Sequence, residues 1–141
     1  MITLALLDQM SKDNLAGLQA DKDLFWEELP LQSNGKPAEG VWLVTRGGSS
    51  GFAGRNLHTV VDIFVAFNDK SKTASVEQDI WKWILKNQGF VKLEGKSGPA
   101  EYCFENIRLN SIQTPQNMGA TKNGAIVKVS SVEIVYSLAK K

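Results

Sequence analysis

The 141-residue sequence contains few of the residues that usually carry chemistry. It has a single cysteine, Cys103, and a single histidine, His58. An internal disulfide is therefore excluded, and a zinc or other transition-metal cluster has too few soft ligands. A nucleophilic pair of these two residues stays open as an alternative, but no neighbouring residue activates the thiol. A structural role is the better interpretation of both.

The sequence also lacks an excess of charge of either sign and a long hydrophobic run. Its formal net charge is +1 at pH 7, which gives no argument for a nucleic acid, membrane or acidic partner. No stretch approaches the roughly 20 apolar residues that span a bilayer. The apolar run Met1–Leu7 has no basic residues before it and ends at Asp8, so no signal peptide is predicted. We therefore expect one soluble cytoplasmic domain, residues 1–141.

No active-site motif emerges from the polar residues. The glycine-rich segment Gly47–Gly51 lacks the Lys-Ser/Thr ending of a phosphate-binding loop and leads into a strand instead of a helix. Asp62 lies inside an apolar strand pattern, on the same face as His58 and Val60. A hydrogen-bonded sheet or interface carboxylate is the better interpretation of Asp62 than a catalytic one. The sequence thus predicts neither a catalytic residue nor a cofactor.

The most regular pattern lies between Leu57 and Gly89. Apolar residues occupy both faces of Leu57–Phe67, which predicts a central strand covered on two sides. After a polar link at 68–73, Ser75 is predicted to cap a helix, with Gln78 in the capping-box position and Gly89 just past its end. The residues predicted to form the apolar face of this helix are Val76, Ile80, Trp83, Ile84 and Asn87.

Trp81 and Trp83 stand two positions apart on this predicted helix and cannot both face the same core. We therefore expect Trp81 to be exposed or buried by a partner, because tryptophan is enriched in protein interfaces. The alternative stays open that the helix is wide enough to cover much of the sheet.

The remaining apolar patterns predict one more helix and several strands. Residues 2–15 form an amphipathic first helix, with Ile2, Leu6, Leu7, Met10 and Asn14 on one side. The predicted strands are Asp23–Leu29, which ends before Pro30 because proline cannot continue a ladder, Gly40–Arg46 antiparallel to it, a short one at Phe90–Leu93, and two long ones at Tyr102–Ile112 and Ala125–Leu138. The order is α-β-β-β-α-(β)-β-β. It predicts an α+β two-layer sandwich, a mainly antiparallel sheet with two helices on one face.

Two segments are predicted to be projecting loops. Residues 47–56 hold four glycines in eight positions, which disfavours regular structure. Residues 114–124 lie between the last two strands and end in Asn123-Gly124, a strong signal for a tight turn.

The order of these features resembles the tail terminator proteins of long non-contractile-tailed bacteriophages, some of them labelled minor capsid proteins. The resemblance covers nearly the whole chain. After a leading helix come the strand Phe25–Pro30, ending in Leu-Pro, and the strand Val41–Gly51, running into a glycine-rich loop. The strand around Val61-Asp62-Ile63 follows, then a helix and a long strand pair that ends in the valine-rich Val132–Tyr136.

The resemblance implies a structural virion protein without catalysis, cofactor or metal. It implies a hexameric ring on the head-proximal end of the tail tube, assembled in the host cytoplasm, which stops tube growth and joins the head-tail connector protein. Phage DNA would pass through the lumen without specific binding, and no membrane is involved. By region, the residues expected at contacts with the tube, the connector or a neighbour are Arg46, Phe52, Arg55, Trp81, Met118 and Lys122.

Two other interpretations stay open. The chain could be another head-tail connector protein, an adaptor or a stopper. From a different class, it could be a small nucleic-acid-binding or ligand-binding module that uses exposed aromatic side chains with Arg46, Arg55 and Arg108.

Overall fold

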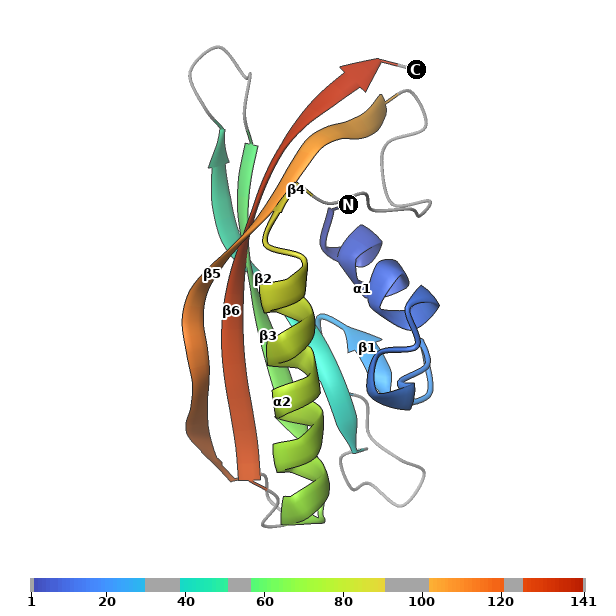
Figure 1. The fold of residues 1–141 in the computed structure, drawn as a ribbon, viewed down its shortest axis with the longest axis vertical. Helices are drawn as coiled ribbons and strands as arrows, with labels where there is room; N and C mark the ends of the chain where they lie inside the picture. Colours follow the sequence, from blue (N-terminus) through green and yellow to red (C-terminus); the bar gives the residue numbers. More distant parts are fainter. Residues whose placement is uncertain (1, 30–38, 51–56, 91–101, 121–125, 141) are drawn as a thin grey trace.

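Two helices and one mixed β-sheet make up the part of the chain that the structure, a computed structural model, describes: residues 2–29, 39–50, 57–90, 102–120 and 126–140. The predicted α+β class is confirmed (Figure 1). The elements, in chain order, are α1 (Ile2–Lys12), a short 3-10 helix η1 (Leu15–Gly17), β1 (Leu24–Trp26), β2 (Gly40–Ser50), β3 (Leu57–Ala66), α2 (Lys70–Lys86), β4 (Gly89–Phe90), β5 (Tyr102–Ala120) and β6 (Ile126–Lys140).

The six strands lie in the order β1-β2-β3-β6-β5-β4. β1 is parallel to β2, with Leu24 opposite Val41, and every other neighbouring pair is antiparallel. The prediction that the first two strands are antiparallel is therefore wrong. The predicted strand Asp23–Leu29 is also too long, because Glu27 adopts a φ of 69°. This left-handed conformation ends the extended backbone directly after Trp26.

The core lies on one face of β3, the central strand. Side chains alternate along a strand, and those of Val61, Ile63 and Val65 are buried. They belong to one apolar cluster with residues of both helices, such as Met10 of α1 and Ile80 of α2. Between them, on the other face, His58, Val60, Asp62 and Phe64 are only half-buried. The prediction that both faces of this strand are covered is therefore wrong for these four side chains, which stay partly accessible.

The predicted helix faces are confirmed. α1 buries Ile2, Leu6, Leu7 and Met10, although it ends at Lys12 and leaves Asn14 exposed. α2 buries Val76, Ile80, Trp83 and Ile84. The indole Nε1 of Trp83 donates a hydrogen bond of 2.9 Å to Asp13 Oδ2, which joins α2 to the segment after α1.

The N-cap of α2 lies six residues before the predicted cap, Ser75. Asp69 is the N-cap, because its side chain accepts a hydrogen bond of 2.9 Å from the backbone N–H of Ser71. Thr73, predicted to lie in a link, is buried in the first turn, where its hydroxyl accepts from the N–H of Phe67. At the other end Asn87 is the C-cap. Gly89 is the first residue of β4, so its predicted role as the residue that ends the helix is wrong.

β2 continues through the first four residues of the segment 47–56, which was predicted to be a projecting loop. Gly47 pairs with Val60 and Ser50 with Leu57, after a bulge between Thr45 and Gly47. Ladder hydrogen bonds to β3 satisfy the backbone here and outweigh the entropic cost of the glycines. The loop prediction is wrong for residues 47–50, and residues 51–56 lie outside the described part of the chain.

β5 continues in the same way through most of the second predicted loop. Gln116 pairs with Val129 and Ala120 with Ile126. Pro115 is tolerated because it falls in a stretch of shifted register between Gln113 and Gln116, and proline is found in strands at bulges and edges. The loop prediction is wrong for residues 114–120, and residues 121–124 lie outside the described part.

Neither α1 nor α2, nor any other helix among the described residues, is long and apolar enough to cross a membrane.

Gly40 offers a test of how closely β1 approaches β2. Its φ is +153°, and a Cβ placed on it would lie 2.6 Å from the carbonyl oxygen of Asp23, whereas a Cβ on Gly47 at φ +138° would meet nothing within 4 Å. Gly40→Ala should therefore lower the free energy of unfolding more than Gly47→Ala does, by about 1–3 kcal/mol, because only the first creates a clash with backbone. Urea unfolding of both variants measures the difference; equal losses would contradict the close approach.

Candidate functional site

The face of the sheet opposite the buried Val61, Ile63 and Val65, here called the outer face, gathers side chains from three strands. Paired residues of antiparallel neighbours point to the same side, so the register places Trp42 and Val44 of β2 beside Phe64 and Asp62 of β3. It places Ser131 of β6 on the other side of Asp62. The described outer-face residues of these strands are Trp42, Val44, Arg46, His58, Val60, Asp62, Phe64, Val127, Val129, Ser131, Glu133 and Val135.

The apolar part of the outer face is centred on a stacked aromatic pair. The rings of Trp42 and Phe64 have centroids 5.1 Å apart and an interplanar angle of 10°. Both side chains are half-buried, as are the neighbouring Val44 and Val60. Stacked pairs contribute about 0.5–1.5 kcal/mol beyond the area they bury. This part of the face is therefore apolar and partly accessible.

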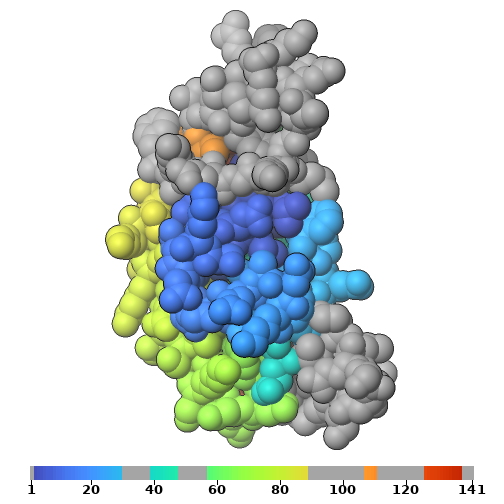
Figure 2. All heavy atoms as spheres, turned by 90° about the vertical axis from the view of Figure 1, so that its right-hand side faces the viewer, coloured from blue at the N-terminus to red at the C-terminus, as the bar shows by residue number. Residues whose placement is uncertain are grey.

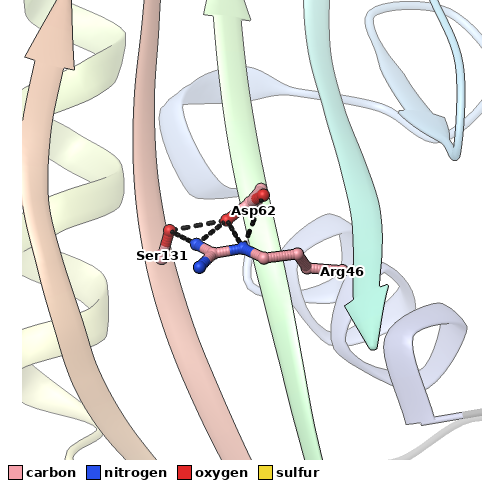
Figure 3. A network of polar contacts seen from close by, with 3 residues as sticks. All are labelled: Arg46, Asp62 and Ser131. Carbon is pink, nitrogen blue, oxygen red and sulfur yellow. Dashed lines mark hydrogen bonds and ion pairs between the residues drawn. The ribbon is translucent and has the colours of Figure 1, made fainter. Parts of the chain in front are cut away.

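The polar part is a network of three residues from three strands (Figure 3). Arg46 Nε donates to both carboxylate oxygens of Asp62, at 3.1 and 3.0 Å, and Arg46 Nη2 donates to Oδ1 as well. Nη2 also donates to Ser131 Oγ at 2.6 Å, and this hydroxyl donates in turn to Asp62 Oδ1 at 2.6 Å. Arg46 stands at the bulge of β2, and its side chain crosses β3 to reach β6.

The network determines the charge state of Asp62. Burial by itself would raise the pKa of this carboxyl, since its side chain is only 16% exposed, but the hydrogen bonds from Arg46 and Ser131 and the guanidinium charge lower the pKa below its ordinary value. The same carboxylate, through its hydrogen bond and then its charge, raises the pKa of Arg46. Asp62 is thus an ionised, hydrogen-bonded partner of Arg46 near neutral pH and is not tuned as a general base.

The prediction that Asp62 is a hydrogen-bonded sheet carboxylate is confirmed. Its arginine partner could not be identified from sequence spacing, because the bulge decides on which side of β2 the Arg46 side chain emerges. Ser131 was missed as well, because its place beside Asp62 depends on the register between β3 and β6.

His58 lies near the end of the outer face. Its Nδ1 is 3.7 Å from Glu133 Oε2, and Asn110 Nδ2 donates to Glu133 Oε1 at 3.3 Å. This is a partly exposed polar cluster with ordinary surface contacts.

Backbone register separates His58 from Cys103. His58 pairs with Val135 and Cys103 with Ala139, so they lie two strands apart and four residues apart along β6. These offsets correspond to about 10 Å across the strands and about 14 Å along them. A direct contact between the two residues is excluded.

The residues predicted at contacts do not form one cluster. Arg46 is exposed but engaged with Asp62. Phe52, Arg55 and Lys122 lie outside the described residues, and Met118 lies in β5 with its side chain outside them.

Trp81 does not behave as predicted. It is half-buried and packs against the core of its own chain, so the alternative of a wide helix describes α2 better. The exposed large apolar side chains among the described residues are Trp26, at 37%, and Leu85, at 46%. Sequence reasoning missed Trp26 because it assigned that residue to the interior of a longer strand.

The described residues contain no group of three or more His, Cys, Asp or Glu side chains that could hold a metal ion.

A scan against protein-family models finds no match for this chain, and a comparison with curated proteins finds none either.

Asp62→Asn should destabilise the fold by about 1–3 kcal/mol near neutral pH, since it removes the charged acceptor of Arg46 and Ser131. The folded-state pKa of Asp62 is lowered, so the wild-type advantage is fully present above the unfolded-state pKa of about 4. It is lost as pH falls through the lower folded-state pKa, because the folded chain then binds the proton too. Urea unfolding of both proteins from neutral to acid pH measures this difference.

The double variant Arg46→Met with Asp62→Asn is the matched control. Its free energy of unfolding should lack the pH dependence that Asp62 gives the wild type, and the double variant leaves no unpaired guanidinium. A difference between wild type and Asp62→Asn that does not change with pH would contradict the assignment.

Proposed function

We propose that this protein is a structural subunit of a bacteriophage virion, a tail terminator. In this proposal a hexameric ring caps the head-proximal end of the tail tube, stops its polymerisation and provides the surface that joins the connector. The chain has no catalytic role in this proposal. The order of features along the sequence supports the proposal.

The observation that carries the proposal is the outer face. It presents an apolar area, centred on Trp42 and Phe64, beside an arginine that is already paired with Asp62. Such a surface is suited to contact with another protein, because aromatic and apolar area stabilises an interface and no charge has to be desolvated without a partner.

The finer architecture belongs to the same proposal. We interpret the sheet and the two helices as a two-layer sandwich in the order α-β-β-β-α-β-β-β, with the helices holding one face and the other left for assembly. Both helices contribute to one apolar cluster with the same face of β3, which supports this interpretation.

The pairing of Arg46 also supports passage of DNA without retention. A protein that contacts many phosphates with lysine and arginine binds DNA tightly and in a salt-dependent manner. Arg46 gives its donors to Asp62 and Ser131 instead. The alternative of a nucleic-acid-binding module thereby loses one of its three arginines; Arg55 lies outside the described residues, and Arg108 is exposed.

The nearest alternative is another head-tail connector protein, an adaptor or a stopper. It differs from a terminator in the partner that it binds. The test is to add purified protein to polymerising tail tube protein encoded in the same genome. A terminator should bind one tube end in electron micrographs and hold tube length constant, whereas a connector should bind neither the growing tube nor its end. Mass photometry should show a hexamer of this protein, either alone or bound to the tube.

The double variant Trp42→Ser with Phe64→Ser removes the apolar part of the outer face and should lose tube binding. Its free energy of unfolding should fall no further than that of a variant with a truncated core side chain. Protein that stays monomeric with tube protein present and leaves tube growth unchanged would contradict the proposal. A gel shift with duplex and single-stranded DNA at moderate salt should show no binding, and a shift there would favour the nucleic-acid module.

A further inference from the structure

One edge of β2 is covered only in part by the sheet. On one side, β2 pairs with β3 from Gly40 to Ser50, with a bulge on the way. On the other side, β1 pairs with three residues of β2 only, from Val41 to Leu43. No described strand lies beside the rest of this edge, and Figure 1 shows the last part of β2, in teal, at the margin of the sheet. We call the backbone of residues 46–50 on this side the open edge.

The open edge carries backbone groups that the sheet does not use. In an antiparallel pair, successive residues direct their N–H and C=O groups alternately toward the partner strand and away from it. The ladder with β3 uses the groups on one side, and the groups on the other side have no partner strand among the described residues. Unpaired groups at a sheet edge are a template for a further extended chain. The chemistry of the open edge therefore selects an extended peptide backbone.

β1 shows how the neighbouring part of the same edge binds a strand. It lies parallel to β2, with Trp26 opposite Leu43. Directly after Trp26, the backbone of Glu27 adopts a φ of 69° and β1 ends. The Glu27 carboxylate then takes the place of a strand carbonyl, because its Oε1 accepts from the N–H of Thr45 at 3.4 Å and from the Thr45 hydroxyl at 2.8 Å. Beyond Thr45, no described strand pairs with this side of β2.

The open edge lacks the usual protection of a free strand. Proteins commonly protect such edges with proline or lysine, and residues 46–50, Arg-Gly-Gly-Ser-Ser, contain neither. The charge of Arg46 does not protect the edge, because this side chain crosses β3 to Asp62 and Ser131 (Figure 3). After the bulge, four consecutive pairs that begin at Gly47 keep β2 regular. The open edge is thus a short, regular strand margin.

The glycines of β2 are consistent with the approach of a further strand. Glycine in a strand often marks a place where another backbone comes close. At Gly40 that backbone is β1, since an added Cβ would lie 2.6 Å from the carbonyl oxygen of Asp23. Gly47 has a φ of +138°, which by itself favours glycine, and an added Cβ there would meet nothing within 4 Å. The space beside Gly47 is therefore free for a partner.

The end of the open edge next to β1 is acidic. Glu27 lies there through its contact with Thr45, and both Glu27 and Glu28 are exposed. The segment from α1 to β1 lies on the outside of the molecule, in blue and light blue in Figure 2. A lysine or arginine of an incoming strand would complement the acidic charge, whereas the phosphates of a nucleic acid would be repelled.

We infer that the open edge of β2 is a docking site for an extended segment of another protein. The segment adds a strand to the sheet in line with β1 and places a lysine or arginine next to Glu27. Backbone hydrogen bonds supply the affinity in this mode of recognition. The open edge is already ordered by its ladder with β3, which lowers the cost of binding. The inference goes beyond the proposed function and does not depend on it.

Hydrogen exchange of the full chain tests the docking site. The probes are two short capped peptides of alternating threonine and valine, with a lysine at the first or the last position, so that both strand directions are sampled. With a peptide at about ten times its Kd, exchange of the outward-facing amides of residues 46–50 should slow about tenfold. Amides bonded to β3 should exchange as before. NMR measures both, and failure of both peptides to bind at about 1 mM overturns the inference.

N-methylated peptides separate strand addition from binding through side chains. Methylation of alternate amides removes the donors from one edge of the peptide and leaves the other edge intact, because a strand directs successive N–H groups to opposite sides. Of two peptides methylated on the odd or on the even amides, one should bind about tenfold more weakly than the parent, since its lost donors faced β2. The other should bind like the parent. Equal affinities of the two methylated peptides overturn the inference.

Proline variants test the same donors on the protein. One of the two neighbours Gly48 and Ser49 directs its N–H outward. Proline at that residue removes an edge donor and leaves the ladder with β3 intact, so the variant should stay folded and bind the peptide about tenfold more weakly. Proline at the other residue removes a ladder bond and should lower the free energy of unfolding. Unchanged peptide binding by both Gly48→Pro and Ser49→Pro overturns the inference.

The acidic end of the open edge has its own test. Glu27→Gln keeps an acceptor for Thr45 and removes the charge, so it should weaken binding of the lysine peptides about threefold at low salt. Leu85→Ser is the control, because it alters an exposed apolar side chain on α2. It should leave peptide binding unchanged. Binding that does not depend on Glu27 or on salt counts against the basic residue in the partner.

A second copy of this chain is the competing occupant. In that case the outward-facing amides of residues 46–50 would become protected as the concentration of the peptide-free protein rises, and analytical ultracentrifugation would show association that the peptides reverse. This result overturns the inference. Tube capping is measured without these peptides, so a failure of the docking site leaves the proposed function standing, and a failure of tube capping leaves the docking site standing.

Discussion

The alternation of side chains along β3 is the constraint on which the rest of this structure depends. One strand in the middle of the sheet has to serve two environments, because successive side chains point to opposite faces. Val61, Ile63 and Val65 enter the core beneath both helices. Asp62 and Phe64, placed between them, must lie on the outer face, and neither can be moved inward without shifting the register of every pair along β2 and β6.

The polar network on the outer face follows from this constraint. A carboxylate in the middle of a sheet needs partners, since an unpaired buried charge is costly. The bulge in β2 brings Arg46 across β3, and Ser131 completes the set from β6. Three strands are thereby joined by side chains as well as by the ladder, beside the aromatic pair. A surface of this kind suits the contact with another protein that we propose.

The periodicity of the sequence predicted the features that depend on residues close together in the chain. It identified the buried faces of α1 and α2 and the position of β3, because an amphipathic pattern reports which side of an element meets the core. It failed where distant strands decide the outcome. Glycines at Gly47 and Gly48 and the proline at Pro115 argue for loops locally, yet long ladders with β3 and β6 keep both segments extended. Of the candidate site, the hydrogen-bonded role of Asp62 was predictable, but its partners were not.

By itself the sequence determined the α+β class, the apolar faces of the helices and the absence of a disulfide, because these follow from composition and from periods of 3.6 and 2 residues. Only the tertiary structure decided which residues are accessible. Trp81 was expected outside and packs against the core, whereas Trp26 was expected inside a strand and is exposed, because Glu27 turns the backbone directly after it. Exposure depends on what neighbouring elements cover, and residues far apart in the sequence provide that cover.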